Sequence, residues 1–274
     1  MGEAITGREF QRIVWDYYKK FGRADLPWRR LEADGSLDPY KVLVSEIMLQ
    51  QTQVGRVVPK YEAFLAEFPS IKDLASAELG AVLYLWNGLG YNRRAKYLWQ
   101  AAQEITTTYH GRFPDSQEKL TELPGVGKNT AGAIIAYAYN LPVVFVETNI
   151  RTAFIHHFFQ DEDTVKDAAI ERLIEETLPD EGEYRDWYWA LMDYGTHLKQ
   201  TVGNLSRRSA VYTRQSQFAG SFRQVRGQVI RALQAKPKAE EQLRAEINDE
   251  RLASAIEALI EEGLVRRQHN KLSL

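Results

Sequence analysis

The chain has 274 residues, of which 44% are hydrophobic and 26% charged, so it has room for one large domain or for two or three small ones with apolar cores. It contains no cysteine, which excludes disulfides, thiolate metal sites and cysteine-bound iron–sulfur clusters. The formal net charge of −2 is not typical of a nucleic-acid-binding protein, but binding depends on where the charges cluster. The sequence shows no membrane-spanning apolar run and no signal-peptide core near residue 1, so we expect a cytoplasmic protein.

Helical periodicity runs through most of the chain. Apolar residues recur every three or four positions within 14–21, 44–49 and 57–68, a spacing typical of amphipathic helices. Glycine and proline fall between such runs, as at Leu26-Pro27, Phe68-Pro69 and Phe113-Pro114. Strand-like alternation is almost absent before the last ten residues. The sequence therefore predicts an all-α unit of short helices from residue 1 to about residue 200.

Glu46 is a carboxylate in an otherwise apolar predicted helix, within the stretch DPYKVLVSEIMLQQTQV. Apolar surroundings favour the protonated form of a carboxylic acid, which suits a general acid working near neutral pH. The structural alternative is an ion-paired helix residue.

The stretch LPGVGKNTAGAII, residues 123–135, predicts a tight turn followed at once by a helix. Gly125 and Gly127 let a ligand approach the backbone closely, and the first amides of a helix have no partner within it. Such a turn can bind a phosphate oxygen without regard to base sequence. By itself, the same pattern is also typical of a plain connection between two helices.

Glu147 and Asn149 follow an apolar run in PVVFVETNIRTAF, about twenty residues after the glycine turn. A carboxylate at this position can serve chemistry, or it can simply cap the helix that begins there.

Charge is distributed unevenly in the second half of the chain. Residues 161–186 hold eleven acidic residues and three basic ones, which indicates a solvated acidic helical face. Residues 199–231 hold seven basic residues and no acidic one, with aromatic residues between them. This stretch is either a linker lying on the surface or a segment that follows a phosphate backbone.

Residues 222–274 form a separate small module in our interpretation. Three short amphipathic helices followed by a short hairpin are typical of the winged-helix variant of the helix-turn-helix. The third helix carries Glu250, Glu257, Glu261 and Glu262, a poor surface for a major groove. Packing or protein contact is therefore as good an interpretation of the module as base reading.

Four stretches occur in the order seen in one superfamily, namely SEIMLQQTQV, LWNGLGYNRRAKYL, LPGVGKNTAGA and VETNIR. Together they resemble the helix-hairpin-helix (HhH-GPD) DNA glycosylases, and among these most closely the MutY-type adenine DNA glycosylases, which remove adenine mispaired with oxidised guanine. The resemblance extends from LPWR at Leu26 to LMDYG at Leu191. It implies an all-α, two-lobed helical glycosylase fold, to which the small winged-helix-like module is added.

The resemblance implies roles for the residues that match the family motifs. Glu46 matches the glutamate that protonates the departing adenine and handles the attacking water, and Glu147 stands where an aspartate stabilises the sugar cation. Asn149 matches the asparagine that orients this site. Gln51 and Tyr91 match the residues that wedge into the duplex beside the flipped base. The chemistry needs such groups, because a purine leaves readily only when protonated and is unreachable inside the base stack.

DNA contacts are expected from the glycine turn and from three arginines, namely Gly125, Gly127, Lys128, Asn129, Arg29, Arg207 and Arg208. The resemblance also implies that the turn can hold Na⁺ or K⁺ on its carbonyls near Val126; no other cofactor or metal is expected. Superfamily members that cut the strand carry a lysine where Asn129 stands, so we expect no lyase activity.

Four departures from the family pattern bear on the substrate. Position 147 is Glu instead of Asp, and the iron–sulfur loop is missing because the chain has no cysteine. Trp189 stands where the adenine enzymes usually carry Gln or Glu, and residues 222–274 do not resemble the family's reader of oxidised guanine.

The predicted domains are a lobe of residues 1–29 with 137–200, a six-helix barrel with the helix-hairpin-helix over 30–136, a basic linker over 201–221 and the module over 222–274. The predicted function is monofunctional excision of a flipped adenine from a mispair, with double-stranded DNA containing a mispaired or damaged base as the partner. The alternatives are a glycosylase for another base (uracil or thymine opposite guanine, or a damaged purine) and a non-catalytic DNA-binding protein. We expect a monomer without membrane association, on the nucleoid if the source is bacterial.

Overall fold

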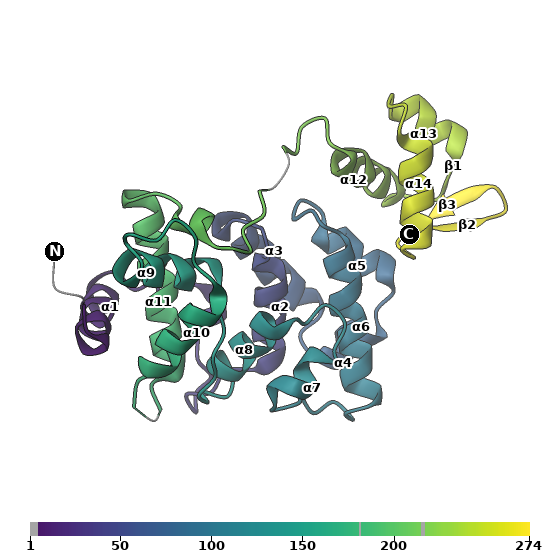
Figure 1. Cartoon of the computed structure of the whole chain (residues 1–274). Coiled ribbons are helices and arrows are strands. Elements are labelled where there is room, and N and C mark those ends of the chain that lie inside the picture. The colour runs from purple at the N-terminus through teal and green to yellow at the C-terminus, as the bar shows by residue number, and fades with distance from the viewer. Residues whose placement is uncertain (1–4, 181, 215–216) are drawn as a thin grey trace. The chain divides into compact units, whose positions relative to one another are not determined.

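The computed structural model describes residues 5–180, 182–214 and 217–274, and these are mostly helical (Figure 1). By its internal contacts the chain forms two compact units. Unit 1 consists of Met1–Val42, Asp115–Glu122 and Val126–Arg214, and unit 2 consists of Leu43–Pro114, Leu123–Gly125 and Gln215–Leu274. Among the described residues, no helix has the length and apolar character needed to cross a membrane.

Unit 1 is built around helices that come from both ends of its sequence. Its elements are α1 (Gly7–Phe21), η1 (Pro27–Arg29), α7 (Gln117–Thr121), α8 (Lys128–Tyr137), α9 (Thr148–Phe158), α10 (Asp167–Glu176), α11 (Tyr184–Thr201) and η2 (Leu205–Arg208). The Phe10 side chain of α1 packs against Phe154 of α9, with ring centroids 4.7 Å apart, and against Trp187 of α11 at 6.1 Å. All three side chains are fully buried. This aromatic cluster joins α1, α9 and α11 into one core.

Helices α9 and α11 are in close backbone contact at Gly195. A Cβ atom at Gly195 would lie 2.1 Å from the carbonyl oxygen of Asn149, a distance that no side chain can occupy. The first turn of α9, which carries Asn149, is therefore fixed to α11 through its backbone.

Unit 2 begins within helix α2 (Pro39–Leu49) and continues through four helices and the C-terminal module. The helices are α3 (Val54–Glu67), α4 (Ile71–Ser76), α5 (Leu79–Trp86) and α6 (Arg93–Thr107). Phe64 of α3 and Trp86 of α5 are fully buried and pack edge to face. Helix α4 starts with a capping box in which Ser70 and Asp73 exchange hydrogen bonds with each other's backbone amides.

The C-terminal module has three helices and a small sheet. In chain order its elements are α12 (Phe222–Leu233), β1 (Lys238–Ala239), α13 (Glu240–Glu246), α14 (Leu252–Glu261), β2 (Arg266–Gln268) and β3 (Lys271–Ser273). The strands are antiparallel in the order β1-β3-β2. The predicted all-α class with a winged-helix-like module is confirmed. Sequence reasoning missed β1, because two residues are too few to show alternation.

The two units group the chain differently from the predicted lobes. Residues 30–42 and 126–136 belong to unit 1, although both were predicted for the six-helix barrel. The segment up to Arg214, predicted as part of the linker, also belongs to unit 1, where Val165 and Ser209 form an isolated β-bridge. The rest of the predicted linker includes residues 215 and 216, which lie outside the described residues. The division into two lobes stays a prediction.

Candidate functional site

The predicted hairpin connects α7 to α8. Gly125 has a φ of +76°, a left-handed conformation that favours glycine, and a Cβ there would lie 2.6 Å from the Cβ of Tyr97. Gly127 is the N-cap of α8 and leaves open space at its Cα. The first amides of α8 thus begin beside a residue without a side chain, which is the geometry that anion binding at a helix N-terminus requires.

Helix α8 is tied to the segment that precedes Glu147. The Asn129 side chain donates a hydrogen bond to the carbonyl oxygen of Val146 at 2.7 Å. Further along α8, a Cβ at Gly132 would lie 2.7 Å from the Cβ of Phe145, so only glycine allows this approach. Asn129, predicted to contact DNA, therefore also positions the backbone that carries the second carboxylate.

Glu147 is the N-cap of α9, as the capping alternative anticipated. One of its carboxylate oxygens accepts a hydrogen bond from the backbone amide of Asn149 at 2.7 Å. The side chain of Asn149 accepts a hydrogen bond from the ammonium of Lys199 at 3.4 Å. Both Glu147 and Asn149 are partly exposed. The cap leaves the second carboxylate oxygen of Glu147 as an acceptor for a ligand, so capping and chemistry are compatible here.

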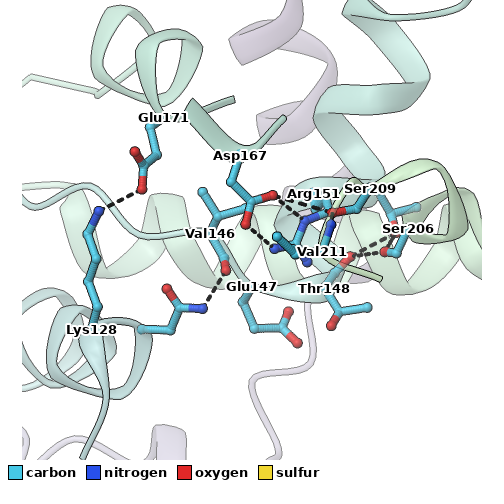
Figure 2. Close-up of polar contacts among 12 residues, drawn as sticks. Lys128, Val146, Glu147, Thr148, Arg151, Asp167, Glu171, Ser206, Ser209 and Val211 are labelled. Carbon is cyan, nitrogen blue, oxygen red and sulfur yellow. Dashed lines mark hydrogen bonds and ion pairs between the residues drawn. The ribbon is translucent and has the colours of Figure 1, made fainter. Parts of the chain in front are cut away.

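The first turn of α9 is supported from behind by polar contacts. Arg151 donates to both carboxylate oxygens of Asp167, at 2.9 and 2.7 Å (Figure 2). Ser206 donates to the carbonyl oxygen of Thr148 at 2.8 Å. These contacts join α9 to α10 and η2, so the helix turn that follows Glu147 is held in place from two sides.

The two predicted wedge residues share an uncommon backbone conformation. Gln51 has a φ of 56° and Tyr91 a φ of 48°, in the left-handed region that non-glycine residues rarely adopt. Such strain persists only where the surrounding structure enforces it, and it concentrates at functional sites. Gln51 is exposed and Tyr91 is half-buried.

Arg94, at the start of α6, holds the two wedge loops together. It is 8% exposed, and its guanidinium donates to oxygens of the segments around both wedge residues: Ile47, Met48, Gln50, Thr52, Leu89 and Gly90. Burial lowers its pKa to about 10, so it is charged at neutral pH. Sequence reasoning missed this residue. Its signal was the helical period shared with the buried Leu98, Ala101 and Ile105.

Glu46 lies on α2 between the buried residues Ser45 and Ile47, and its own side chain is partly exposed. It belongs to unit 2 together with Gln51, Tyr91 and Gly125, whereas unit 1 contains Glu147, Asn149, Lys128 and Asn129. The predicted site residues are thus divided between the two units.

The structure argues against the predicted DNA contact of Arg29. Its side chain is 4% exposed and donates to both carboxylate oxygens of Asp193, at 2.8 and 2.9 Å. Its guanidinium also lies 5.2 Å from the ring centroid of Trp189. Trp189 itself is buried and stacks on Tyr137, so this departure from the family pattern is part of the core.

Arg207 and Arg208, both predicted to contact DNA, lie in different surroundings. Arg208 donates to the backbone carbonyls of Phe159, Gln160 and Glu162, just after α9 ends, so its guanidinium holds a turn together. The structure thus gives Arg208 a structural role, and its contact with DNA stays a prediction. Arg207 is exposed. Of this pair, Arg207 is the better candidate for a phosphate.

Potential metal ligands do not cluster in the part of the chain that the structure describes. Within the described residues, no group of three or more His, Cys, Asp or Glu side chains could hold a metal ion.

The resemblance implied a helical hairpin and a carboxylate beyond it, and the structure shows the turn before α8 and Glu147 at the start of α9. The chain belongs to the HhH-GPD superfamily of base excision DNA repair proteins, whose family model matches residues 44–180.

Several similar proteins are adenine DNA glycosylases. That of Mycolicibacterium smegmatis is 33% identical over 226 residues, which cover 77% of this chain and 76% of that protein. That of Buchnera aphidicola (subsp. Baizongia pistaciae) is 37% identical over 174 residues, covering 64% of this chain and 47% of that protein. The human protein is 43% identical over 145 residues, with coverages of 52% and 26%. The chain therefore spans less than half the length of the last two.

Solved structures agree with this fold. A thermostable thymine-DNA glycosylase matches with a TM-score of 0.59 at 25% identity, covering 69% of this chain and 85% of that one. An endonuclease III trapped covalently on DNA matches with a TM-score of 0.57 at 17% identity, covering 70% and 87%. The second match shows a likeness of fold alone.

Proposed function

We propose that the chain is a monofunctional DNA glycosylase that hydrolyses the N-glycosidic bond of an adenine flipped out of a mispair, for example opposite 8-oxoguanine or guanine. The observation that carries the proposal is the first turn of α9, where Glu147 and Asn149 are held together and fixed to the hairpin helix through Asn129. The adenine DNA glycosylases of Mycolicibacterium smegmatis and Buchnera aphidicola support adenine as the base.

In this proposal the two carboxylates have separate roles. Glu46 protonates the adenine, which turns a poor leaving group into a good one. Glu147 stabilises the positive charge that develops on the sugar as the bond breaks, and Asn149 orients the site. A glutamate reaches about an ångström further than the family's aspartate, and misplacement on that scale can change a rate about a hundredfold. The cap on the Asn149 amide restricts this longer side chain.

The remaining roles concern double-stranded DNA. Gln51 and Tyr91 enter the duplex beside the flipped base, and the hairpin from Gly125 to Asn129 binds the backbone. The left-handed turn at Gly125 and the open space at Gly127 suit a Na⁺ or K⁺ ion bound by carbonyls near Val126. Such an ion would add positive charge where a phosphate binds.

Absence of lyase chemistry is part of the proposal. A strand-cutting glycosylase needs an amine to form a Schiff base with the sugar. At position 129 there is an amide, which donates to Val146. The amine of Lys128 is in an ion pair with Glu171 at 2.6 Å. Bond hydrolysis by water is therefore the reaction we assign.

One observation favours a second candidate, removal of thymine or uracil opposite guanine. The thymine-DNA glycosylase matches over more than two thirds of this chain. Glu147 in place of aspartate is compatible with such a change of base. Trp189 does not support it, because this side chain is buried in the core.

A base-release assay under single-turnover conditions tests the proposal. The panel holds adenine opposite 8-oxoguanine, guanine and cytosine, together with uracil and thymine opposite guanine and a damaged purine. We expect release of adenine from the first two duplexes, without strand cleavage. Release of another base in its place selects the second candidate. Release of no base, with tight duplex binding, would leave a non-catalytic DNA-binding protein.

Variants of the two carboxylates test the assigned roles. Glu46→Gln is expected to abolish base release while duplex affinity stays within about a few-fold, because the acid is lost and the DNA contacts remain. Glu147→Gln removes the charge at nearly constant shape and should also be inactive.

Glu147→Asp is the matched control, since aspartate is a good N-cap and keeps α9 stable. A lower rate in Glu147→Asp indicates a site built for the longer side chain, and a higher rate indicates a site shaped for aspartate. Full activity of Glu147→Gln would remove this residue from the mechanism.

We further propose that the protein acts as a monomer in the cytoplasm, and on the nucleoid if the source is bacterial. Sedimentation of the free protein and of its duplex complex tests the first part, and a dimer in either sample would contradict it.

A further inference from the structure

The C-terminal module contacts the predicted wedge loop directly. Arg223, in the first turn of α12, places its guanidinium carbon 5.1 Å from the ring centroid of Tyr91 and donates a hydrogen bond to the Tyr91 hydroxyl. The guanidinium of Arg94 lies 5.4 Å from the same ring centroid. Arg94 is a near neighbour of Tyr91 in sequence, whereas Arg223 is 132 positions away. Helices α6 and α12 of unit 2 therefore both contact the Tyr91 ring through an arginine.

Glu262, at the end of α14, fixes the module beside this loop. Its carboxylate accepts hydrogen bonds from Arg226 of α12 at 2.7 Å and from Arg93 of α6 at 2.6 Å. Its backbone carbonyl accepts another from the ammonium of Lys96. The hydrogen bond from Arg226 and the one from Arg93 hold the pKa of Glu262 below its usual value. One ionised carboxylate thus joins α12 and α14 to α6, the helix that begins two residues after Tyr91.

A second anchor lies at the other end of α12. The Gln234 side chain accepts a hydrogen bond from Asn87 and donates one to the Leu83 carbonyl, each at 3.3 Å. The module is therefore held near the end of α5 as well as on α6. With both ends of α12 held, Arg223 has a defined position over the Tyr91 ring.

A wedge works best when its side chain is already in the inserting conformation. The backbone of Tyr91 is strained, and Arg94 fixes the carbonyls of Leu89 and Gly90 before it. These contacts fix the loop backbone and Arg94 also lies against the ring, but Arg94 does not bond the hydroxyl, so rotation about the tyrosine side-chain bonds is only partly restricted. Arg223 restricts that rotation by stacking on the ring and bonding the hydroxyl, so less order has to be created when the duplex binds.

We propose that Arg223 is a positioning residue for base flipping, through which the C-terminal module sets the conformation of the Tyr91 wedge. The inference rests on the proposed function, because it takes Tyr91 as the wedge. It also accounts for a module whose third helix exposes Glu257 and Glu261, an unfavourable surface for a groove of DNA. The module acts on DNA through Tyr91 and needs no base-reading helix.

The test uses the full chain and a duplex with 2-aminopurine beside the target adenine, whose fluorescence rises when stacking is lost. Fluorescence is recorded in the Glu46→Gln background, which holds the complex before chemistry, and single-turnover rates are measured with Glu46 intact. Arg223→Ala should lower both the fluorescence change and the rate about tenfold, the effect of losing one partly desolvated cation–π contact. Duplex affinity should change much less, about twofold, since only one positive charge is removed.

Two further variants separate stacking from charge and from folding. Arg223→Lys keeps the charge but loses the planar group, so it should not restore the rate. Arg231→Ala is the matched control, because Arg231 is exposed on the same helix and its loss removes the same charge. It should leave both the rate and the fluorescence change at the parent level.

A double-variant cycle with Tyr91→Ala decides whether Arg223 acts through Tyr91. If it does, Arg223→Ala has no further effect once the tyrosine is gone. Parent-like rates and fluorescence in Arg223→Ala, or an equal loss with and without Tyr91, overturn the inference while leaving the proposed function intact. If the parent releases no base and gives no fluorescence change, the proposed function and the inference fall together.

Discussion

Arg29 in unit 1 and Arg94 in unit 2 are both buried, but their guanidinium groups donate to different kinds of acceptor. Arg29 in unit 1 is paired with the carboxylate of Asp193, which also accepts from Arg23 at 2.7 Å. Arg94 in unit 2 donates to backbone carbonyls and to the hydroxyl of Thr52. The two arginines differ in what their acceptors connect. The ion pair of Arg29 joins segments that are distant in the sequence, whereas the carbonyl acceptors of Arg94 fix the conformation of two loops.

The difference matters because of where the acceptors lie. Asp193 is 164 positions from Arg29 in the chain, and their pair closes the core of unit 1. Three of the acceptors of Arg94 immediately precede or follow the two predicted wedge residues, Gln51 and Tyr91: Gln50, Thr52 and Gly90. Loss of the first arginine's partner should therefore weaken folding, and loss of the second arginine should disturb both folding and base flipping.

Asp193→Asn is expected to have the largest effect on stability. Removing one partner of a buried ion pair leaves an uncompensated charge and costs about 3–5 kcal/mol. Urea unfolding followed by circular dichroism measures this loss. Glu32→Gln is the control, because it breaks the exposed pair with Lys41 and should cost less than about 1 kcal/mol. Equal losses in both variants would mean that burial of the Arg29 pair has no energetic weight.

Arg94→Met should cost less stability, about 2 kcal/mol, because it removes a buried cation together with its hydrogen bonds but leaves neutral carbonyls behind. It should also abolish the 2-aminopurine signal of the wedge. Arg94→Lys keeps the charge without the planar group, so we expect partial recovery of stability and little recovery of flipping. A normal fluorescence signal in a folded Arg94→Met protein would show that the loops hold their conformation without this residue.

The burial of Arg94 could have been predicted from the sequence, but the acceptors of the two arginines could not. The period of α6 placed Arg94 on the buried side with Leu98, Ala101 and Ile105. Its acceptors could not be foreseen, because they depend on the tertiary approach of the α2 end to the loop before α6. The ion pair of Arg29 could not be foreseen for a similar reason, since nothing local to LPWR indicates a carboxylate 164 positions away.

Other parts of the site were predictable to different degrees. The glycine turn and the capping position of Glu147 follow from local residue patterns, and the structure shows both. The hydrogen bond from Asn129 to Val146 does not, because it joins two segments that become neighbours only after folding. Local chemistry was therefore readable from the sequence, and the contacts that position it were not.

Low pH should also distinguish the two arginines, because it should reduce the stability contributed by the Arg29 pair and not that contributed by Arg94. We expect this effect to be smaller than those of the substitutions. Burial alone would raise the pKa of Asp193, but the hydrogen bonds and charge of Arg29, with those of Arg23, lower it below the ordinary value. Its stabilisation is therefore complete above the unfolded pKa, about 3.9, and is lost as pH falls through the lower folded value.

The stability difference between the parent and Asp193→Asn should accordingly narrow as the pH is lowered from 7 into that range. The difference for Arg94→Met should stay constant, because Arg94, with a pKa of about 10, does not titrate there. Urea midpoints measured at a series of pH values test this. A parallel narrowing for both variants would point to a general acid effect on the fold.

The smallest effect is expected at the neighbouring residues Arg207 and Arg208, which repeat the comparison near the surface. Arg208 resembles Arg94, since it donates to backbone carbonyls. Arg208→Gln should therefore cost about 1 kcal/mol of stability and have little effect on duplex affinity.

Exposed Arg207 should show the opposite pattern. Arg207→Gln should leave urea unfolding unchanged, weaken all duplexes alike and reduce the slope of log affinity against log salt by about one. Fluorescence anisotropy titrations at several salt concentrations measure that slope. An unchanged slope in Arg207→Gln would make residues 205–214 a structural segment of unit 1, because a phosphate contact cannot be removed without releasing fewer counterions on binding.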